Sequence, residues 1–444
     1  MRGWVHIKHR AKDERPGRGR VLTSLVLLAA LIATTPLVGC SGGPETVIAG
    51  QVTITVWHSQ KAEAAKLLAQ LAAEFSTRET NIIVKLVAKP DEATLLKDLR
   101  QAASSERAPC VAEVPADQLH VLRLADIIRP LQSFIANRYY GLQVSDSEDF
   151  WPCLVQANAM GRQVWGVPFS HKLYALLYNP ELVSRPPATW DELKSMAQSL
   201  TYRNGELASS RFGVAFRPDA ELLCLLLYQN GGRLLSGDSS RWVFNGAEGR
   251  GALEYLYELA TVRKAALLTM GRPEQAVATG RAAMAIGQPT WPLDPKDGPV
   301  AVAPLPKGAT AAALAPGTSL TLVNGHTDAE EEAAWRFMRW LTSPEISARW
   351  SASTGDVPVR RQAMAQFVWA AGLGSLPGWQ QVVAQMDSVV LLPSVTGTAA
   401  AGSWEKVRGD LSQAVTAYLL GAVSSSQSAL DSVAIPANRA LSGP

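Results

Sequence analysis

The sequence has few of the residues and motifs on which enzymes and metal proteins depend. It contains no GxSxG elbow, no GxxxxGK[ST] phosphate-binding loop and no HExxH helix. Gly372-Leu-Gly374 is followed by Ser-Leu-Pro-Gly, which is a loop pattern and not a dinucleotide fingerprint. We therefore predict no catalytic residue, no metal and no cofactor, although the paired carboxylates of a glycosidase would leave no such motif. The four histidines beyond residue 39 also lack metal-ligand spacing: His58, His120, His171 and His326.

Cysteine is scarce as well. The chain has four cysteines, and the three that follow Cys40 lie far apart in the sequence. An odd number without close spacing argues against a disulfide framework and against a zinc site. Cys224 lies within the apolar run Leu222–Leu227 and is interpreted as a small buried apolar residue. A disulfide bridge between Cys110 and Cys153 is compatible with the sequence.

The body of the chain lacks an excess of either charge. Residues 1–39 hold seven basic and two acidic residues, which leaves 35 basic and 37 acidic residues in the remainder. The leader thus has a net charge of +5 and the remainder −2, so the positive net charge of the chain comes from the leader. The body has no basic surplus for nucleic acid, and we predict no such partner.

The leader itself is informative. The apolar, uncharged stretch Val21–Val38 follows Arg20 and ends in Leu37-Val38-Gly39-Cys40. It resembles a bacterial lipoprotein signal peptide, in which this cysteine is lipidated. The resemblance implies a signal peptide at 1–39, a lipid anchor on Cys40, a tether over 40–51 and a body outside the cell membrane. An uncleaved transmembrane anchor is the alternative, because 18 apolar residues just span a bilayer.

Beyond the leader, predicted strands alternate with predicted helices. Val52–Val56, Ile82–Val87 and Cys110–Val114 have strand character, and amphipathic stretches lie between them. This order indicates an α/β fold with a largely parallel sheet. Ligands of such sheets bind beyond the carboxyl ends of the strands. The side chains at these ends are Trp57, His58, Ser59, Glu113 and Asp117.

Later stretches resemble a known family when taken together. They are similar to extracellular solute-binding proteins of ABC importers, the group that contains maltose- and glycerol-phosphate-binding proteins. The resemblance covers Val52–Ala440. Its pieces, in order, are VTITVWHS (52–59), GVPFSHKLYALLYN (166–179), PATWDELKSMA (187–197), NGGRLL (230–235), GRAAMAI (280–286), GTSLTL (317–322), AAWRFMRWLTSPE (333–345) and STGDVPVR (353–360).

The resemblance implies a two-lobed periplasmic-binding-protein fold of type II, with ligand held between lobes that close by hinge motion. One lobe comprises 52–166 and 319–391, and the other 167–318 and 392–440. The crossings are WGVPFS (165–170), GTSLTL (317–322) and Leu391–Val395. The implied function is the substrate-binding subunit that delivers a solute to a membrane permease. A carbohydrate-active enzyme and a sensory lipoprotein are the other classes considered.

A sugar site needs aromatic faces for the rings and polar groups for the hydroxyls. Each candidate also has a purely structural interpretation, as a packing, strand-end or surface residue. The aromatic candidates are Trp57, Trp165, Phe169 and Trp291. The polar candidates are His58, Ser59, Glu113, Asp117, Ser170, His171, Thr318, Ser319, Asp356 and Arg360.

Two departures from the family pattern bear on the ligand. Asp356 replaces a tyrosine that touches ligand in many relatives, and Thr398–Ala401 lacks the arginine of glycerol-phosphate binders. Both changes disfavour an anion, so we predict a neutral carbohydrate, with glycerol-phosphate, phosphodiester or polyol ligands as the alternative. Within the first crossing, Phe169, Ser170 or His171 should face the ligand. Leu176 and Leu177 should not, because they belong to a core strand.

Overall fold

The computed structural model describes residues 50–102, 105, 107–204, 206–289, 298–392 and 399–441. The predictions for the signal peptide, Cys40, most of the tether and Trp291 lie outside these residues, as does most of the third crossing. The described residues belong to one compact unit, Ala49–Pro444. Within them, no helix combines the length and the apolar character that crossing a membrane requires.

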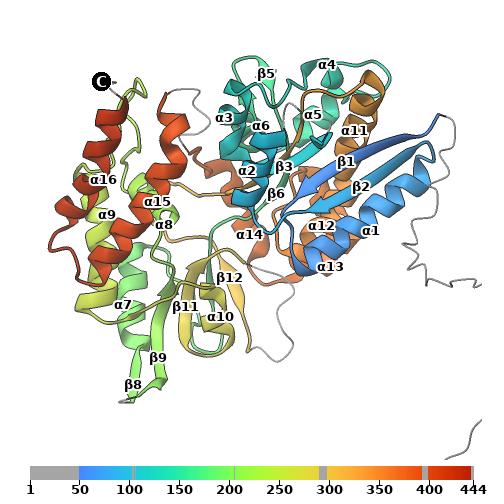
Figure 1. The fold of residues 1–444 in the computed structure, drawn as a ribbon. Coiled ribbons are helices and arrows are strands. Elements are labelled where there is room, and N and C mark those ends of the chain that lie inside the picture. The colour runs from blue at the N-terminus through green and yellow to red at the C-terminus, as the bar shows by residue number, and fades with distance from the viewer. Residues whose placement is uncertain are drawn as a thin grey trace, which may run out of the picture. The chain divides into compact units, whose positions relative to one another are not determined.

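The first sheet has the order β2-β1-β3-β13-β6 (Figure 1). Strand β1 is parallel to β2 and β3, and β13 is antiparallel to β3 and β6. The mainly parallel arrangement predicted from the alternation of strands and helices is therefore present. The strands are β1 (Val52–His58), β2 (Ile82–Ala88), β3 (Val111–Pro115), β6 (Val167–His171) and β13 (Gly317–Leu322).

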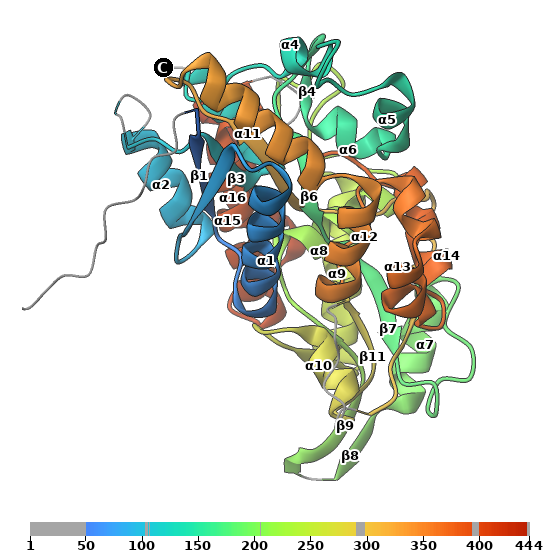
Figure 2. The same cartoon turned by 90° about the vertical axis from the view of Figure 1, so that its right-hand side faces the viewer.

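Helices cover both faces of this sheet, because its side chains alternate between two apolar clusters. Ile54 and Val56 pack with α1, α11 and α12, which lie together in Figure 2. Trp57 and Val114 pack on the opposite face with α2 and α3. These helices are α1 (Ala62–Arg78), α2 (Glu92–Ala102), α3 (Leu119–Leu124), α11 (Asp328–Leu341) and α12 (Pro344–Thr354).

The second sheet repeats the same plan, with the order β10-β9-β11-β7-β12 and β8 beside β9. Strand β9 is parallel to β10 and β11, and β7 is antiparallel to β11 and β12. Each sheet thus has three parallel strands, then one antiparallel strand, then an edge strand. The bounds are β7 (Ala175–Tyr178), β8 (Tyr202–Asn204), β9 (Glu206–Phe216), β10 (Ala266–Leu268), β11 (Ala282–Gly287) and β12 (Ala301–Ala303).

Helices around the second sheet begin where the sequence places capping residues. The Thr189 hydroxyl accepts a hydrogen bond from the Glu192 backbone N–H, as a capping residue does. Helices α15 and α16 lie beside α8 and α9 (Figure 1), and Trp404 and Leu411 are buried there. The helices are α7 (Trp190–Leu200), α8 (Ala220–Gln229), α9 (Ala247–Tyr257), α10 (Pro273–Ala278), α15 (Ala399–Leu419) and α16 (Ser426–Leu441).

Shorter elements complete the described chain. Before β6 lie α4 (Gln132–Ile135), α5 (Val144–Asp149), α6 (Pro152–Ala157), β4 (Ala159–Met160) and β5 (Gln163–Val164). After α12 lie α13 (Phe367–Ala371) and α14 (Trp379–Val383), and α14 contacts β12 of the second sheet.

Three segments connect the sheets and run side by side. The backbone N–H groups of Lys172 and Tyr174 donate to the carbonyls of Pro316 and Leu314, each at 3.0 Å. The Val390 N–H donates to the Ala313 carbonyl, also at 3.0 Å. These bonds place the passages between the sheets at residues 172–174, 313–316 and 389–390. The first two lie a few residues away from the crossings expected from sequence, because β6 and β13 pair within the first sheet.

Candidate ligand-binding cleft

A cavity of about 350 Å³ lies against the three connecting segments. Residues from both sheets line it, and on the first sheet they follow the carboxyl ends of β1, β3 and β6. This is where a parallel sheet presents its ligand site. Six of the residues predicted from sequence line this cavity: Ser59, Glu113, Asp117, Ser170, His171 and Thr318.

A second cavity of about 610 Å³ adjoins the first and shares Glu92, Gln288, Pro316 and Arg408 with it. Its walls come from the segments after β9, β10 and β11 and from α15. Carboxyl ends of parallel strands from both sheets therefore face one continuous space. We call the two cavities together the cleft.

Glu113 is the most deeply buried acid of the cleft, with 1% of its surface exposed. Its Oε1 accepts hydrogen bonds from Gln60 Nε2 and Thr318 Oγ1, each at 2.6 Å, while Oε2 has no partner among the described residues. Burial raises the pKa of Glu113 to about 7, although the two hydrogen bonds favour the ionised form. A buried acceptor without a donor is costly, and a ligand that donates a hydrogen bond to this oxygen would remove the cost.

Asp117 and Arg408 meet from opposite sides of the cleft. Arg408 Nη1 lies 3.9 Å from Asp117 Oδ2 and 3.4 Å from Glu221 Oε1, so α15 is tied to both sheets. Asp117 Oδ1 has no partner among the described residues, and burial raises the pKa of this carboxyl. Burial and the nearby Asp117 charge also raise the pKa of Glu92.

The charge of the cleft is unbalanced. Seven carboxylates line it among the described residues, against one lysine and three arginines. Burial and the neighbouring Glu221 raise the pKa of Asp219 to about 7, which shows how poorly some of these charges are compensated. Such a lining suits a ligand that donates hydrogen bonds. The carboxylates are Glu92, Glu113, Asp117, Asp219, Glu221, Glu274 and Glu405, and the cations are Lys172, Arg217, Arg272 and Arg408.

Asp356 and Arg360 do not line the cleft, in contrast to the prediction. The Asp356 carboxylate accepts from Ser170 Oγ at 2.5 Å, Lys172 Nζ at 2.6 Å and Trp350 Nε1 at 2.7 Å, so it is fully engaged inside the protein. Arg360 is buried, and its Nε donates to Asp149 at 2.7 Å. Asp356 joins β6 to α12, and Arg360 joins the segment after α12 to α5. Asp356 therefore says nothing about an anionic ligand.

The three aromatic candidates within the described residues lie outside the cleft lining. Trp57 lies under Lys89, whose Nζ is 3.6 Å from the ring centroid, and Phe169 packs against Trp350 with centroids 4.5 Å apart. Trp165 packs at the edge of the apolar cluster behind the first sheet. Among the described residues, Tyr174 does line the cleft, and the sequence analysis did not select it.

His58 and Ser319 are buried strand residues that do not reach the cleft. His58 is 3% exposed, and burial lowers the pKa of its imidazole. Ser319 is fully buried within β13. Of the narrower prediction for the first crossing, Ser170 and His171 do line the cleft, Phe169 does not, and Leu176 and Leu177 are core residues.

Several cleft residues were missed, and two kinds of signal could have found them. Glu92 follows the carboxyl end of β2, so the strand-end rule applies to it as it does to Glu113. Glu405, Arg408 and Ser412 share one face of α15 at helical spacing. An arginine therefore does reach the site from the C-terminal helix, although Thr398–Ala401 lacks one.

The three described cysteines are free thiols, so no bridge joins Cys110 to Cys153. Cys153 lines the cleft, and its Sγ lies 3.4 Å from the Met386 carbonyl oxygen. Cys224 is fully buried, as expected.

Two sheets that share one plan, joined by three segments along a polar cleft, define a two-lobed α/β binding protein. The sequence matches the bacterial extracellular solute-binding protein family over residues 70–372. The chain belongs to this family.

Relatives and solved structures agree with this assignment. A maltotriose-binding protein of Pyrococcus abyssi is 22% identical over 71% of this chain and 68% of its own length. The cyclic alpha-maltosyl-1,6-maltose binding protein of Arthrobacter globiformis has a similar fold, with a TM-score of 0.72, 22% identity and coverage of 89% and 100% of the two chains. A Mycobacterium tuberculosis protein, UgpB, in complex with glycerophosphocholine has a TM-score of 0.73, 17% identity and coverage of 88% and 98%.

Proposed function

We propose that this protein is the substrate-binding subunit of an ABC importer, which captures a neutral carbohydrate in the cleft and delivers it to a membrane permease. The unpartnered Oε2 of buried Glu113 is the observation that carries the proposal. A sugar hydroxyl would donate to this oxygen, and Asp117 Oδ1 offers a second acceptor without a partner. Relatives that bind maltotriose and a cyclic maltosyl sugar support this ligand class.

The charge of the cleft favours a sugar over a phosphate ester. A phosphate would meet seven carboxylates, and the shared arginine Arg408 already lies between Asp117 and Glu221. Bringing like charges together without water costs energy, whereas hydroxyl groups gain hydrogen bonds. Glycerophosphocholine, the ligand of one structural neighbour, remains the second candidate because its cationic end would suit the carboxylates.

We further propose that Cys40 carries a lipid that anchors the body to the outer face of the cell membrane. The support is the basic segment, the apolar stretch Val21–Val38 and the Leu37–Cys40 motif. Mass spectrometry of the protein recovered from native membranes tests this directly. A diacylated N-terminal Cys40 would support the anchor, and an intact Met1 with an unmodified Cys40 would overturn it.

A thermal-shift screen tests the ligand class. A ligand present at a hundredfold excess over its Kd stabilises the folded state by about 2.7 kcal/mol. We expect maltooligosaccharides or other neutral sugars to raise Tm, and glycerophosphocholine and glycerol phosphate to leave it unchanged. A shift with the phosphate esters alone would replace the carbohydrate by the second candidate, and flat curves throughout would count against both.

The same sugar separates binding from catalysis. After prolonged incubation with the protein, mass spectrometry should recover the sugar unchanged, because a binding subunit breaks no bond. Release of shorter or hydrated products would instead assign the cleft to a carbohydrate-active enzyme. A sensor kinase gene in place of neighbouring permease genes would favour a sensory lipoprotein.

A further inference from the structure

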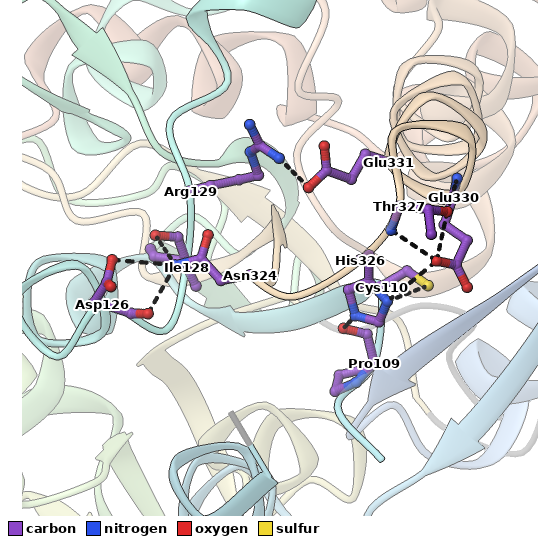
Figure 3. Close-up of polar contacts among 10 residues, drawn as sticks. All are labelled: Pro109, Cys110, Asp126, Ile128, Arg129, Asn324, His326, Thr327, Glu330 and Glu331. Atoms are coloured by element: carbon purple, nitrogen blue, oxygen red, sulfur yellow. Dashed lines mark hydrogen bonds and ion pairs between the residues drawn. The ribbon is translucent and has the colours of Figure 1, made fainter. Parts of the chain in front are cut away.

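A cluster of metal-binding side chains lies at the end of β3 that is remote from the cleft (Figure 3). Cys110 immediately precedes β3, and His326 and Glu330 lie at the start of α11. Cys110 Sγ is 3.5 Å from His326 Nδ1, which is 3.9 Å from Glu330 Oε2. The three ligand atoms lie within 4.8 Å of one another. No residue of this cluster lines the cleft.

The histidine is held in the tautomer that a metal needs. Its Nε2 lies 2.9 Å from the carbonyl oxygen of Pro109, which can only accept, so Nε2 carries the hydrogen. Nδ1 then presents its lone pair toward Cys110 Sγ and the Glu330 carboxylate. A metal-bound histidine is oriented in the same way, through a hydrogen bond from its other nitrogen to a carbonyl or carboxylate.

The distances fit tetrahedral zinc. With Zn–S near 2.3 Å and Zn–N near 2.0–2.1 Å, a tetrahedral angle separates sulfur from nitrogen by about 3.5 Å. The observed separation of Sγ and Nδ1 is 3.5 Å, so these two side chains need no rearrangement. The carboxylate oxygen would approach Nδ1 by roughly half an ångström, to the separation of about 3.3 Å that Zn–O and Zn–N bonds of this length require.

We propose that Cys110, His326 and Glu330 bind one zinc ion, with water as the fourth ligand. The side chains of His326 and Glu330 are 12% and 34% exposed, which leaves an open side for the water and a path for the ion. Cys110 approaches from the buried side. This site was missed in the sequence because Cys110 and His326 are 216 positions apart, and His326 and Glu330 alone do not make a metal motif.

The charges of the cluster favour a divalent ion. The start of a helix disfavours a cation, but one thiolate and one carboxylate neutralise Zn²⁺. Thr327 donates to Glu330 Oε2 from its backbone N–H at 2.9 Å and its hydroxyl at 2.8 Å, which holds the carboxylate in place before an ion arrives.

The proposed ion would hold β3 against α11 and would not contact the cleft. Glu113 lies in the middle of the same short strand, and no proposed zinc ligand lines the cleft. The zinc site therefore predicts a stability effect with unchanged ligand affinity, and it stands or falls independently of the transport function.

Cobalt spectroscopy of the untagged protein tests the proposal. Treatment with EDTA followed by Co²⁺ titration should give tetrahedral visible bands and a thiolate charge-transfer band that saturate at one equivalent, and Zn²⁺ should abolish both. Without any thiolate band in the wild-type protein the proposal is overturned. Weak octahedral bands alone would mean an adventitious ion.

Matched variants locate the ligand. Cys110→Ser should lose the charge-transfer band and weaken zinc binding at least about 10–100-fold, and His326→Gln should weaken it similarly. Cys153→Ser removes a partly exposed thiol outside the cluster and should leave the charge-transfer band and the zinc affinity unchanged. A band that survives in Cys110→Ser and disappears in Cys153→Ser would place the metal elsewhere. The wild-type spectrum decides the matter even if a variant fails to fold.

Discussion

Two groups of buried carboxylates in this protein look alike in sequence and differ in their partners. Behind the first sheet, Asp149 accepts hydrogen bonds from Arg360 and the Gln362 backbone, and Asp356 accepts three. In the cleft, Glu113 and Asp117 each keep one buried oxygen without a partner among the described residues.

The two groups therefore differ in whether every buried carboxylate oxygen has a hydrogen-bond donor. A buried charge with a full set of donors contributes to the fold, and losing a partner is expensive. A buried charge with an empty acceptor position is unfavourable until a ligand fills it. Burial alone therefore does not separate the two groups of carboxylates, whereas the missing hydrogen-bond donor does.

The largest expected effect on stability comes from removing a hydrogen-bond partner of Asp149, a carboxylate whose oxygens all have donors. Arg360→Met leaves Asp149 buried without its guanidinium, and we expect the free energy of unfolding to fall by about 3–5 kcal/mol. Urea unfolding at neutral pH measures it. The control, Arg349→Met, removes the partly exposed pair with Glu74 and should cost about 0–1 kcal/mol. Ligand affinity of the folded Arg360 variant should be unchanged, and a selective loss of affinity would return Arg360 to the site.

The pH dependence of the free energy of unfolding should report on Glu113, the cleft carboxylate with an unpartnered oxygen. The pKa of Glu113 is about 7 in the folded protein against an ordinary 4.5, so between these values the folded state holds a proton that the unfolded chain has released. The free energy of unfolding should therefore fall as pH rises through this window, by on the order of 3 kcal/mol from Glu113.

His171 acts in the opposite direction, because burial lowers the pKa of its imidazole. Glu113→Gln isolates the glutamate contribution. The wild-type protein should lose stability relative to this variant between pH 5 and 7.5 in the absence of ligand. Parallel curves for the two proteins would show that Glu113 is not held near neutrality.

Glu113→Gln should also weaken binding while it stabilises the empty protein at pH 8. A hydrogen bond to a charged acceptor contributes about 1.5–3 kcal/mol, so the Kd for the sugar should rise about 10–100-fold. Calorimetry and urea unfolding measure the two effects. Glu63→Gln, at an exposed position on α1, serves as the control and should change neither. An unaltered Kd would remove Glu113 from the ligand contacts.

The smallest effect is expected at Phe169, which lies outside the cleft lining. Phe169→Leu alters packing against Trp350, and we expect a loss of about 1 kcal/mol in stability with less than a twofold change in Kd. Tyr174→Leu, in the cleft lining, should weaken binding by more. The reverse order of the two Kd values would restore Phe169 as the stacking residue.

Much of the fold was predictable because its signals are local. The helix caps are an example: the Thr189 and Thr327 hydroxyls accept hydrogen bonds from the backbone N–H groups of Glu192 and Glu330, three residues further on. The strand-end rule brought Ser59, Glu113 and Asp117 to the cleft. Each of these predictions depends on a few neighbouring residues or on the alternation of strand and helix.

The sequence by itself determined the order of strands and helices and placed polar side chains at one edge of the sheet. Only the tertiary structure decided which of these side chains would find a full set of hydrogen-bond partners. Lys172 reaches Asp356 across 184 residues, and Arg360 reaches Asp149 across 211. Arg408 enters the cleft from α15, near the end of the chain. A local pattern can place a carboxylate, but the donors that complete it come from distant segments, and their absence at Glu113 becomes visible only when the chain is folded.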